Sequence, residues 1–213
     1  MQVLQALWPI REVAMPINQN EASEIVNRIG PIFDRVLNEY DFGKYPAEDY
    51  QRFKISFSAL NIPNTDIEDA LIWKWGHWGK ANYPQRHRDL IAEVQRLWPQ
   101  FITSGNGNSA GNTFEWWRAQ LVSSTRYITV AYITHLIHYD EPLPIIDQHN
   151  FRAMNALIGC LRPERKAKKK PSNWDDIATL KSFMQLVGSS IPNRSFGELD
   201  RFLMMYGRNY VAR

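Results

Sequence analysis

Residues 144–157 read PIIDQHNFRAMNAL and form the most informative stretch of this 213-residue chain. Asp147 follows two apolar residues, and after it Phe151, Met154 and Leu157 recur at the spacing of one helix face. An aspartate before such a face is a typical N-cap, because its carboxylate accepts hydrogen bonds from the first free backbone amides. Those amides and the helix dipole also favour the ionised carboxylate. The pattern therefore predicts a helix that begins after Asp147 and a carboxylate fixed at its N-terminus.

Apolar residues keep helical spacing through almost all of the remaining chain, which predicts an all-α fold. Thr65 with Glu68, and Ser195 with Glu198, match the capping box that opens a helix. Residues 103–113, TSGNGNSAGNT, predict a loop because Gly, Asn and Ser favour turns. The predicted helices lie at 22–40 with a break at Pro31, 50–60, 65 to about Gly76, 90–98 ended by Pro99, 174–187 and 195–206. A further helix should start within the stretch 103–113 and run through Phe114, Trp117 and Leu121.

The order D-x-H-x-F-R-x-x-N, behind a proline and two apolar residues, resembles the catalytic-aspartate segment of the helix-hairpin-helix (HhH-GPD) DNA glycosylase superfamily. The last predicted helix, ELDRFLMMYGR at 198–208, looks like the closing helix of the 8-oxoguanine DNA glycosylase-like members. The resemblance covers roughly residues 114–157 and this last helix. It implies two helical subdomains that flank a DNA-binding cleft, and it implies that Asp147 is the catalytic carboxylate.

Residues 127–137, YITVAYITHLI, are rich in β-branched side chains and by propensity alone favour a strand. The resemblance favours a buried helix instead, because the family places a helix, a hairpin and a second buried helix shortly before the aspartate. In this chain residues 116–122 would form the first helix and residues 128–138 the second. The hairpin between them, together with one residue of the aspartate segment, is then expected to contact DNA: Ser123, Ser124, Thr125, Arg126 and His149.

This hairpin departs from the family pattern, which is rich in glycine and in bifunctional members ends in a lysine nucleophile. Hydroxyl groups would have to supply the phosphate contacts here. Tyr127 stands at the lysine position, and a phenol cannot form a Schiff base. The resemblance therefore implies a monofunctional glycosylase without lyase activity. Should a covalent adduct nevertheless form, Lys80 and Lys74 are the first lysines to examine.

Residues 73–88, WKWGHWGKANYPQRHR, combine aromatic and basic side chains just before a predicted helix. A glycosylase must flip the base out of the duplex and hold it by stacking and edge hydrogen bonds, which calls for such side chains. Core packing is the alternative role for the tryptophans. We expect base-pocket residues at Trp75, His77, Trp78, Lys80 and Tyr127, and gap-filling or phosphate contacts from Asn82, Tyr83, Gln85, Arg86 and His87. No metal site and no cofactor is expected, because His77 and His87 have no cysteine or helical histidine partner.

Between Arg162 and Lys170 stand six basic residues and one acidic residue, a net +5 in a chain whose total is +3. Such a concentrated run favours a polyanion contact, although a solvated loop is the alternative. We expect Lys168, Lys169 and Lys170 to contact phosphates. Double-stranded DNA with a modified or damaged base is the expected partner.

Composition excludes several classes of protein. Aromatic residues make up 13% of the chain, which is too much apolar surface for a disordered protein. Cys160 is the single cysteine, so an intrachain disulfide scaffold and a four-cysteine iron–sulfur cluster are excluded. No apolar run reaches the roughly 18 residues of a membrane span, and the first residues lack the features of a signal peptide. The sequence predicts a soluble, cytoplasmic monomer.

The predicted organisation is one glycosylase domain over residues 1–213, with one subdomain at about 60–160 and another formed by 1–59 plus 161–213. The predicted activity is hydrolysis of the N-glycosidic bond of a flipped base, which leaves an abasic site. The substrate would be an 8-oxoguanine-like purine, or a hypermodified base in phage DNA if the role is antiviral defence. Two alternatives stay open: a non-catalytic helix-hairpin-helix DNA-binding protein in which Asp147 is only a cap, and an all-α protein-interaction domain.

Overall fold

A computed structural model describes residues 16–121, 126–168 and 170–212, and within these ranges the regular secondary structure is entirely helical. The all-α prediction is confirmed. Each helix in the same ranges is too short or too polar to cross a membrane. The helices are α1 (Gln19–Ile29), α2 (Phe33–Leu37), α3 (Ala47–Ser58), α4 (Asn64–Lys74), α5 (Gln85–Ser104), α6 (Ala110–Gln120), α7 (Tyr127–Ile137), α8 (Gln148–Leu161), α9 (Trp174–Ser190) and α10 (Phe196–Asn209), with 3-10 turns at Gly30–Ile32 and Asn106–Asn108.

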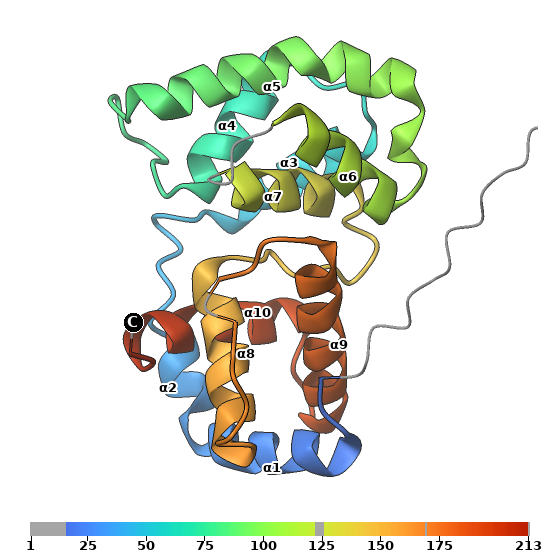
Figure 1. The fold of residues 1–213 in the computed structure, drawn as a ribbon. Helices are drawn as coiled ribbons and strands as arrows, with labels where there is room; N and C mark the ends of the chain where they lie inside the picture. Colours follow the sequence, from blue (N-terminus) through green and yellow to red (C-terminus); the bar gives the residue numbers. More distant parts are fainter. Residues whose placement is uncertain (1–15, 122–125, 169, 213) are drawn as a thin grey trace, which may run out of the picture.

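Figure 1 shows two groups of helices, one above the other. The upper group contains α3 to α7, and the lower group contains α1, α2, α8, α9 and α10. The chain passes between the groups through residues 38–46 and again through residues 138–147. Because α3 packs on α4 and α7, the upper group begins near residue 47, whereas the predicted subdomain began near 60. Because α8 packs on α10, the upper group ends near residue 137, whereas the predicted subdomain ended near 160.

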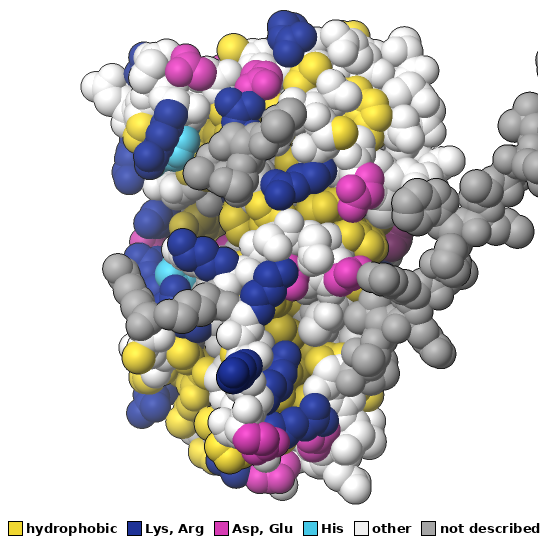
Figure 2. All heavy atoms as spheres, viewed as in Figure 1, with side chains coloured by type: hydrophobic (Ala, Val, Ile, Leu, Met, Phe, Trp, Pro, Cys, Tyr) yellow, Lys and Arg dark blue, Asp and Glu magenta, His cyan; other side chains and the backbone are white. Residues whose placement is uncertain are grey.

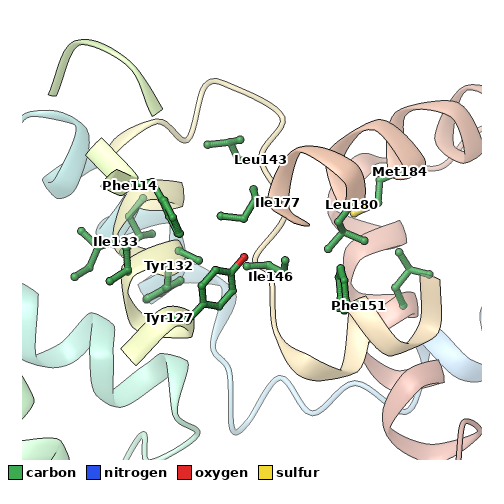
Figure 3. Close-up of a cluster of buried hydrophobic side chains, with 14 of the residues drawn as sticks. Phe114, Tyr127, Tyr132, Ile133, Leu143, Ile146, Phe151, Ile177, Leu180 and Met184 are labelled. Carbon is green, nitrogen blue, oxygen red and sulfur yellow. The ribbon is translucent and has the colours of Figure 1, made fainter. Parts of the chain in front are cut away.

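One hydrophobic core extends through both groups. In Figure 3, Ile146 and Ile177 lie between the aromatic side chains of α7, Tyr127 and Tyr132, and the lower-group side chain Phe151. All five side chains are buried. The segment that leads into Asp147 is therefore held by both groups, and the position of the aspartate depends on how they pack.

The helix at Tyr127–Ile137 is confirmed, although its residues favour a strand. Every residue of α7 except Ile128 is buried. A helix enclosed on all sides needs no polar face, and β-branched side chains fill such a core well. Burial among other helices thus overrides the local propensity.

Two predicted helix boundaries are wrong. Pro99 was expected to end its helix, but α5 continues through it to Ser104 and stops before Gly105, which has a φ of 67°. The pair Thr65 and Glu68 was expected to form a capping box, but α4 begins at Asn64 with Pro63 as its N-cap and without a side-chain cap. Glu68 instead accepts a hydrogen bond from the Tyr83 hydroxyl at 2.7 Å, a tertiary contact that the local pattern does not reveal.

The stretch 103–113 was predicted to be a loop within which the next helix begins. The helix start is confirmed, since α6 begins inside the stretch, but the first two residues of the stretch still belong to α5. Ser109 accepts a hydrogen bond from the amide of Asn112 and caps α6, which already begins at Ala110. The glycine and asparagine residues before it form the short turn Asn106–Asn108. At the other end of the chain the prediction is confirmed, since Ser195 and Glu198 form the capping box of α10.

α8 and α10 approach each other closely at Gly207. A Cβ atom at this position would lie 1.9 Å from the carbonyl oxygen of His149 and 3.1 Å from the amide nitrogen of Ala153. Both neighbours are backbone atoms, so a side chain could be accommodated only by separating the helices. The glycine therefore fixes the N-terminal turn of α8, which carries Asp147, against α10.

Candidate active site

A cleft with a volume of about 1500 Å³ lies between the two groups of helices. In the upper group, α3, α4 and α7 line the cleft, and in the lower group α8 and α10 line it. The segments that follow α2 and α8 also contribute to the lining. Pockets for small molecules typically measure about 300–1,000 Å³, so this cleft can hold a nucleotide together with part of a longer chain. Figure 2 shows Lys and Arg side chains gathered where the two groups meet and over α8 and the segment that follows it.

Asp147 lies in the cleft wall as the N-cap of α8, as the sequence predicts. Its Oδ1 atom accepts hydrogen bonds from the amides of His149 at 2.7 Å and Asn150 at 3.0 Å. The cap uses one carboxylate oxygen, so the second is not needed to hold the helix. A fixed carboxylate with an oxygen to spare can stabilise a positive charge that develops in the cleft.

The side chain of Asn150 fixes the backbone of Asp147. This side chain is 1% exposed and accepts a hydrogen bond from the amide of Asp147 at 2.9 Å, which completes a capping box. Its Nδ2 atom donates to the carbonyl of Ile145 at 3.0 Å and to Oδ1 of Asp200 at 3.1 Å. We call Asp147, Asn150 and Asp200 the carboxylate wall. The backbone on both sides of Asp147 is thereby tied to α10.

Asp200 is the buried acid of the carboxylate wall, and it also lines the cleft. Burial raises the pKa of Asp200 to about 6, and the negative charge of Asp147 adds to the rise. Lys74 and the hydrogen bond from Asn150 act in the opposite direction. Asp200 therefore stays protonated up to a higher pH than an ordinary aspartate does.

The opposite side of the cleft is lined by Tyr50, Trp73, Lys74 and His135, which we call the aromatic wall. The rings of Tyr50 and Trp73 stack with centroids 5.2 Å apart, and Tyr50 also stacks on His135 at 5.9 Å. Trp73 and His135 are buried and Tyr50 is partly exposed, so Tyr50 is the ring of this wall on which a nucleobase can stack.

His135 is a fixed part of the aromatic wall. Its Nδ1 atom donates to the carbonyl of Leu143 at 2.9 Å, so its Nε2 atom accepts from the hydroxyl of Tyr50 at 2.5 Å. Burial lowers the pKa of His135 to about 3, against the opposing effect of the hydrogen bond to Leu143. The imidazole is therefore neutral at physiological pH and serves to orient Tyr50.

Basic side chains surround the cleft, but they are not equally available to a ligand. Of the predicted basic run, Lys168 is paired with Asp176 at 2.6 Å, and Arg162 forms two contacts of 2.6 Å with Glu21 away from the cleft lining. Lys170 is exposed and lines the cleft. The remaining basic residues of the lining come from other segments: Lys44, Lys74, Arg152, Arg201 and Arg208.

The structure brings only some of the predicted site residues together. The cleft is lined by Trp75, Tyr127, Asp147, His149, Lys168 and Lys170. Outside that lining are His77, Trp78, Lys80, Asn82, Tyr83, Gln85, Arg86, His87 and Arg126. The predicted residues Ser123, Ser124, Thr125 and Lys169 lie outside the described ranges.

Several of the residues outside the lining have structural partners. Nε2 of His77 and Nδ1 of His87 are 3.1 Å apart, and the ring of His87 stacks on Trp75 with centroids 4.1 Å apart. Trp78 packs edge-on against Phe53. These contacts tie the segment between α4 and α5 to itself and to the core.

The last residue of the predicted hairpin, Arg126, and the residue after it, Tyr127, are engaged with other parts of the protein. Arg126 forms an ion pair and hydrogen bond with Glu93 of α5. The hydroxyl of Tyr127 donates to the carbonyl of Asn173 at 3.0 Å, across the gap between the helix groups. Figure 3 shows the phenol of Tyr127 directed away from α7 toward the other group.

Sequence reasoning missed Asn150 and Asp200 as parts of the site. Asn150 stands three residues after Asp147, which is the spacing of the second member of a capping box, so a local signal for it existed. Asp200 is an acid on the apolar face of α10, and only the tertiary structure shows that this face meets Asp147. Lys74 was considered only as an alternative nucleophile.

The described residues contain no group of three or more His, Cys, Asp or Glu side chains that could hold a metal ion. No protein-family model, no curated protein and no solved structure matches this chain. Its function must therefore be inferred from the site itself.

Proposed function

We propose that this protein is a DNA glycosylase that hydrolyses the N-glycosidic bond of a flipped, damaged or modified base. The observation that carries the proposal is the carboxylate of Asp147, held at a helix N-terminus in the wall of a cleft large enough for a nucleotide. The resemblance of residues 144–157 to the catalytic segment of helix-hairpin-helix glycosylases points to the same residue.

Cleavage of an N-glycosidic bond builds positive charge on the deoxyribose. The free carboxylate oxygen of Asp147 can stabilise that charge, and the same group can orient the attacking water. The two hydrogen bonds to its Oδ1 atom, with the support of Asn150, hold the group in place before the reaction. A group that is already oriented has no reorganisation cost in the transition state.

The partner under this proposal is duplex DNA. Lys44, Arg152, Lys170, Arg201 and Arg208 give the cleft a positive lining that suits a phosphate backbone. α6 and α7 would form the helix-hairpin-helix pair, and the two helix groups would be the subdomains on either side of the DNA. The aromatic wall supplies stacking surface for the flipped base.

For the excised base, only the chemical class is proposed. The aromatic wall suits a flat purine such as 8-oxoguanine, and the volume of the cleft also leaves room for a larger hypermodified base of phage DNA. The first substrate implies a role in repair and the second a role in antiviral defence. The protein is proposed to act as a monomer in the cytoplasm.

The test is an excision assay on a panel of duplexes that carry oxidised, alkylated, deaminated or phage-type modified bases. Strand breaks that appear after heat and alkali, together with the released base in mass spectrometry, are the expected result. Binding without excision on every duplex would favour the alternative in which Asp147 only caps α8, a role that its two backbone hydrogen bonds already fulfil. Absence of salt-sensitive DNA binding would favour a protein-interaction domain.

A further inference from the structure

The hydroxyl group of Tyr50 lies where two residues of the aromatic wall meet. Tyr50 and His135 both line the cleft, and the Tyr50 hydroxyl is 2.5 Å from Nε2 of His135. His135 is 6% exposed, whereas Tyr50 is only partly buried. A ligand in the cleft can therefore reach the phenol of Tyr50 more readily than the imidazole behind it.

The proton of this hydroxyl is fixed by a chain of two hydrogen bonds. Nδ1 of His135 is 2.9 Å from the carbonyl oxygen of Leu143, and a carbonyl can only accept, so Nδ1 carries the ring proton. Burial lowers the pKa of His135 to about 3, so the ring is neutral and Nε2 has only a lone pair. The Tyr50 hydroxyl donates to that lone pair, and its oxygen then offers the cleft only acceptor lone pairs.

The ring of Tyr50 is held in place by its neighbours. It stacks on Trp73 with centroids 5.2 Å apart, and Nε1 of Trp73 donates to the carbonyl of Pro46 at 3.0 Å. Burial raises the pKa of the Tyr50 phenol, and the negative charge of Asp200 adds to the rise, so the phenol keeps its proton. The cleft thus contains a neutral oxygen that accepts hydrogen bonds at a fixed position.

We propose that the Tyr50 oxygen accepts a hydrogen bond from an N–H group on the edge of the flipped base and thereby selects bases that carry such a group. The inference rests on the proposed function, because a base must enter the cleft. An ordinary hydroxyl rotates and either donates or accepts. Here rotation would leave Nε2 of the buried His135 without a partner, which costs about as much as one lost hydrogen bond. The substrate class is therefore bases that present an amino group or a ring N–H to α3.

A base held in this way meets Tyr50 with its edge, whereas stacking would use the face of the ring. Tyr50→Phe separates the two contacts, because it keeps the ring and removes the oxygen. If the ring face alone held the base, this variant would bind every base as the wild-type chain does.

The probes are duplexes with one unpaired base opposite an abasic site: adenine or hypoxanthine as one pair, cytosine or uracil as the other. Within each pair an amino group is exchanged for an oxygen and a ring lone pair for an N–H group, so donors and acceptors are reversed. A fluorine at C2′ of the probe sugar prevents cleavage, because it disfavours positive charge on the sugar. We expect the wild-type chain to prefer one member of a pair by about 10–100-fold in anisotropy titrations, the range for one unpaired hydrogen-bonding group.

His135→Phe is the decisive variant, because it removes the lone pair that fixes the proton and lets the Tyr50 hydroxyl rotate and donate. The disfavoured probe should then bind about 10-fold tighter than it binds the wild-type chain, while the favoured probe changes little. A gain in affinity cannot result from misfolding. Tyr50→Phe should remove the preference by weakening the favoured probe. Tyr45→Phe is the matched control and should keep the preference, because Tyr45 is another partly buried tyrosine of the cleft lining.

Equal affinities within both pairs for the wild-type chain overturn the inference, and so does a preference that His135→Phe and Tyr50→Phe leave unchanged. If such a chain still excises a base from the panel, the glycosylase proposal stands without the inference. If the preference depends on Tyr50 and His135 but no duplex loses a base, the cleft binds bases selectively and the glycosylase proposal fails.

Discussion

The carboxylate wall and the aromatic wall face each other across one cleft, but they are built in different ways. Asp147 and Asn150 of the carboxylate wall are held by hydrogen bonds between residues only a few positions apart. The aromatic wall joins Tyr50, Trp73 and His135 from three helices through ring stacking and one hydrogen bond. Polar substitutions in the carboxylate wall should therefore change charge and chemistry with little effect on folding, whereas the aromatic wall is also part of the core.

The sharpest test of this difference is Asp147→Asn. Asparagine is nearly as good an N-cap as aspartate, so folding should be retained, but the negative charge is lost. We expect excision to fall by about 10²–10³-fold or more, which is typical for removal of one preorganised electrostatic contact. DNA affinity should stay the same or rise, because a negative charge near phosphates is removed. Single-turnover excision, melting temperature and duplex affinity should be measured on the same variant.

The control for this substitution is Asp175→Asn, an exposed residue in the first turn of α9 that does not line the cleft. It removes the same charge and should excise at the wild-type rate. An Asp147→Asn protein that excises near the wild-type rate would falsify the catalytic assignment and leave Asp147 as a cap.

Gly207→Ala tests how firmly α10 supports the carboxylate wall. The new methyl group would lie 1.9 Å from the carbonyl oxygen of His149, and no side-chain rotation can relieve a clash with backbone. We expect a loss of about 3 kcal/mol in the free energy of unfolding, at the upper end for overpacking, together with reduced excision. Denaturant unfolding measures the first effect.

The matched control for Gly207→Ala is Gly159→Ala in α8, where a Cβ atom meets nothing within 4 Å. Alanine there should stabilise the protein by up to about 1 kcal/mol through helix propensity. Equal stability of the two variants would show that the helices separate at no cost and that the close approach does not fix Asp147.

Asp200→Asn separates the buried charge of the carboxylate wall from its hydrogen bonds. The folded pKa is raised to about 6, above the unfolded value of about 3.9, so wild-type stability should fall as pH rises between these values. The amide cannot ionise but can still accept from Asn150. We therefore expect the variant to gain roughly 3 kcal/mol over wild type well above pH 6, since the two pKa values differ by about 2.1 and each tenfold change in proton affinity is worth about 1.4 kcal/mol.

Urea unfolding of both Asp200 chains at pH 4 and pH 8 checks this expectation. The advantage of Asp200→Asn should be present at pH 8 and nearly absent at pH 4, where the wild-type carboxyl is protonated. The same difference at both pH values would contradict the raised pKa and point to a change in packing instead.

Much of the fold could be predicted from the sequence because it depends on patterns of neighbouring residues. The caps at Asp147 and Ser195 and the break at Pro31 need only neighbouring residues, and the structure confirms them. The limit at Pro99 was wrong because α5 continues through the proline and ends only before Gly105, whose left-handed backbone is a typical helix stop. The capping box at Thr65 was wrong because α4 already begins after Pro63. Local rules are reliable where the partners of a residue lie within one turn.

The residues of the candidate site fall into the same two classes, those recognisable from their neighbours in sequence and those brought together only by the tertiary structure. Asp147 was found from its own segment, while Asp200 is 53 positions later and Lys74 is 73 positions earlier in the chain. No periodicity links these three residues, and they face one cleft only because two groups of helices pack together. The stretch at 73–88 was expected to line the site because of its composition, yet within it Trp73, Lys74 and Trp75 alone do so.

The smallest expected effect concerns the basic run beside the two walls. If Lys168, Lys169 and Lys170 contact phosphates as the sequence predicts, neutralising all three should weaken binding to all duplexes about equally. The ion pair between Lys168 and Asp176 complicates that triple variant, because Asp176 also accepts hydrogen bonds from two backbone amides nearby. Lys170→Ala is the cleaner test, since Lys170 is exposed in the cleft lining.

Lys170→Ala should weaken binding of modified and unmodified duplexes by the same factor, because a phosphate contact carries no sequence information. The plot of log affinity against log salt should become shallower by up to about 0.9, because one phosphate is no longer neutralised. Lys166→Ala is the matched control, as Lys166 is an exposed lysine of the same run outside the cleft lining. Fluorescence anisotropy over a salt series measures both variants. An equal change for the two would mean that the run attracts DNA only as diffuse charge, and no change for either would place the DNA path along the other basic residues of the cleft.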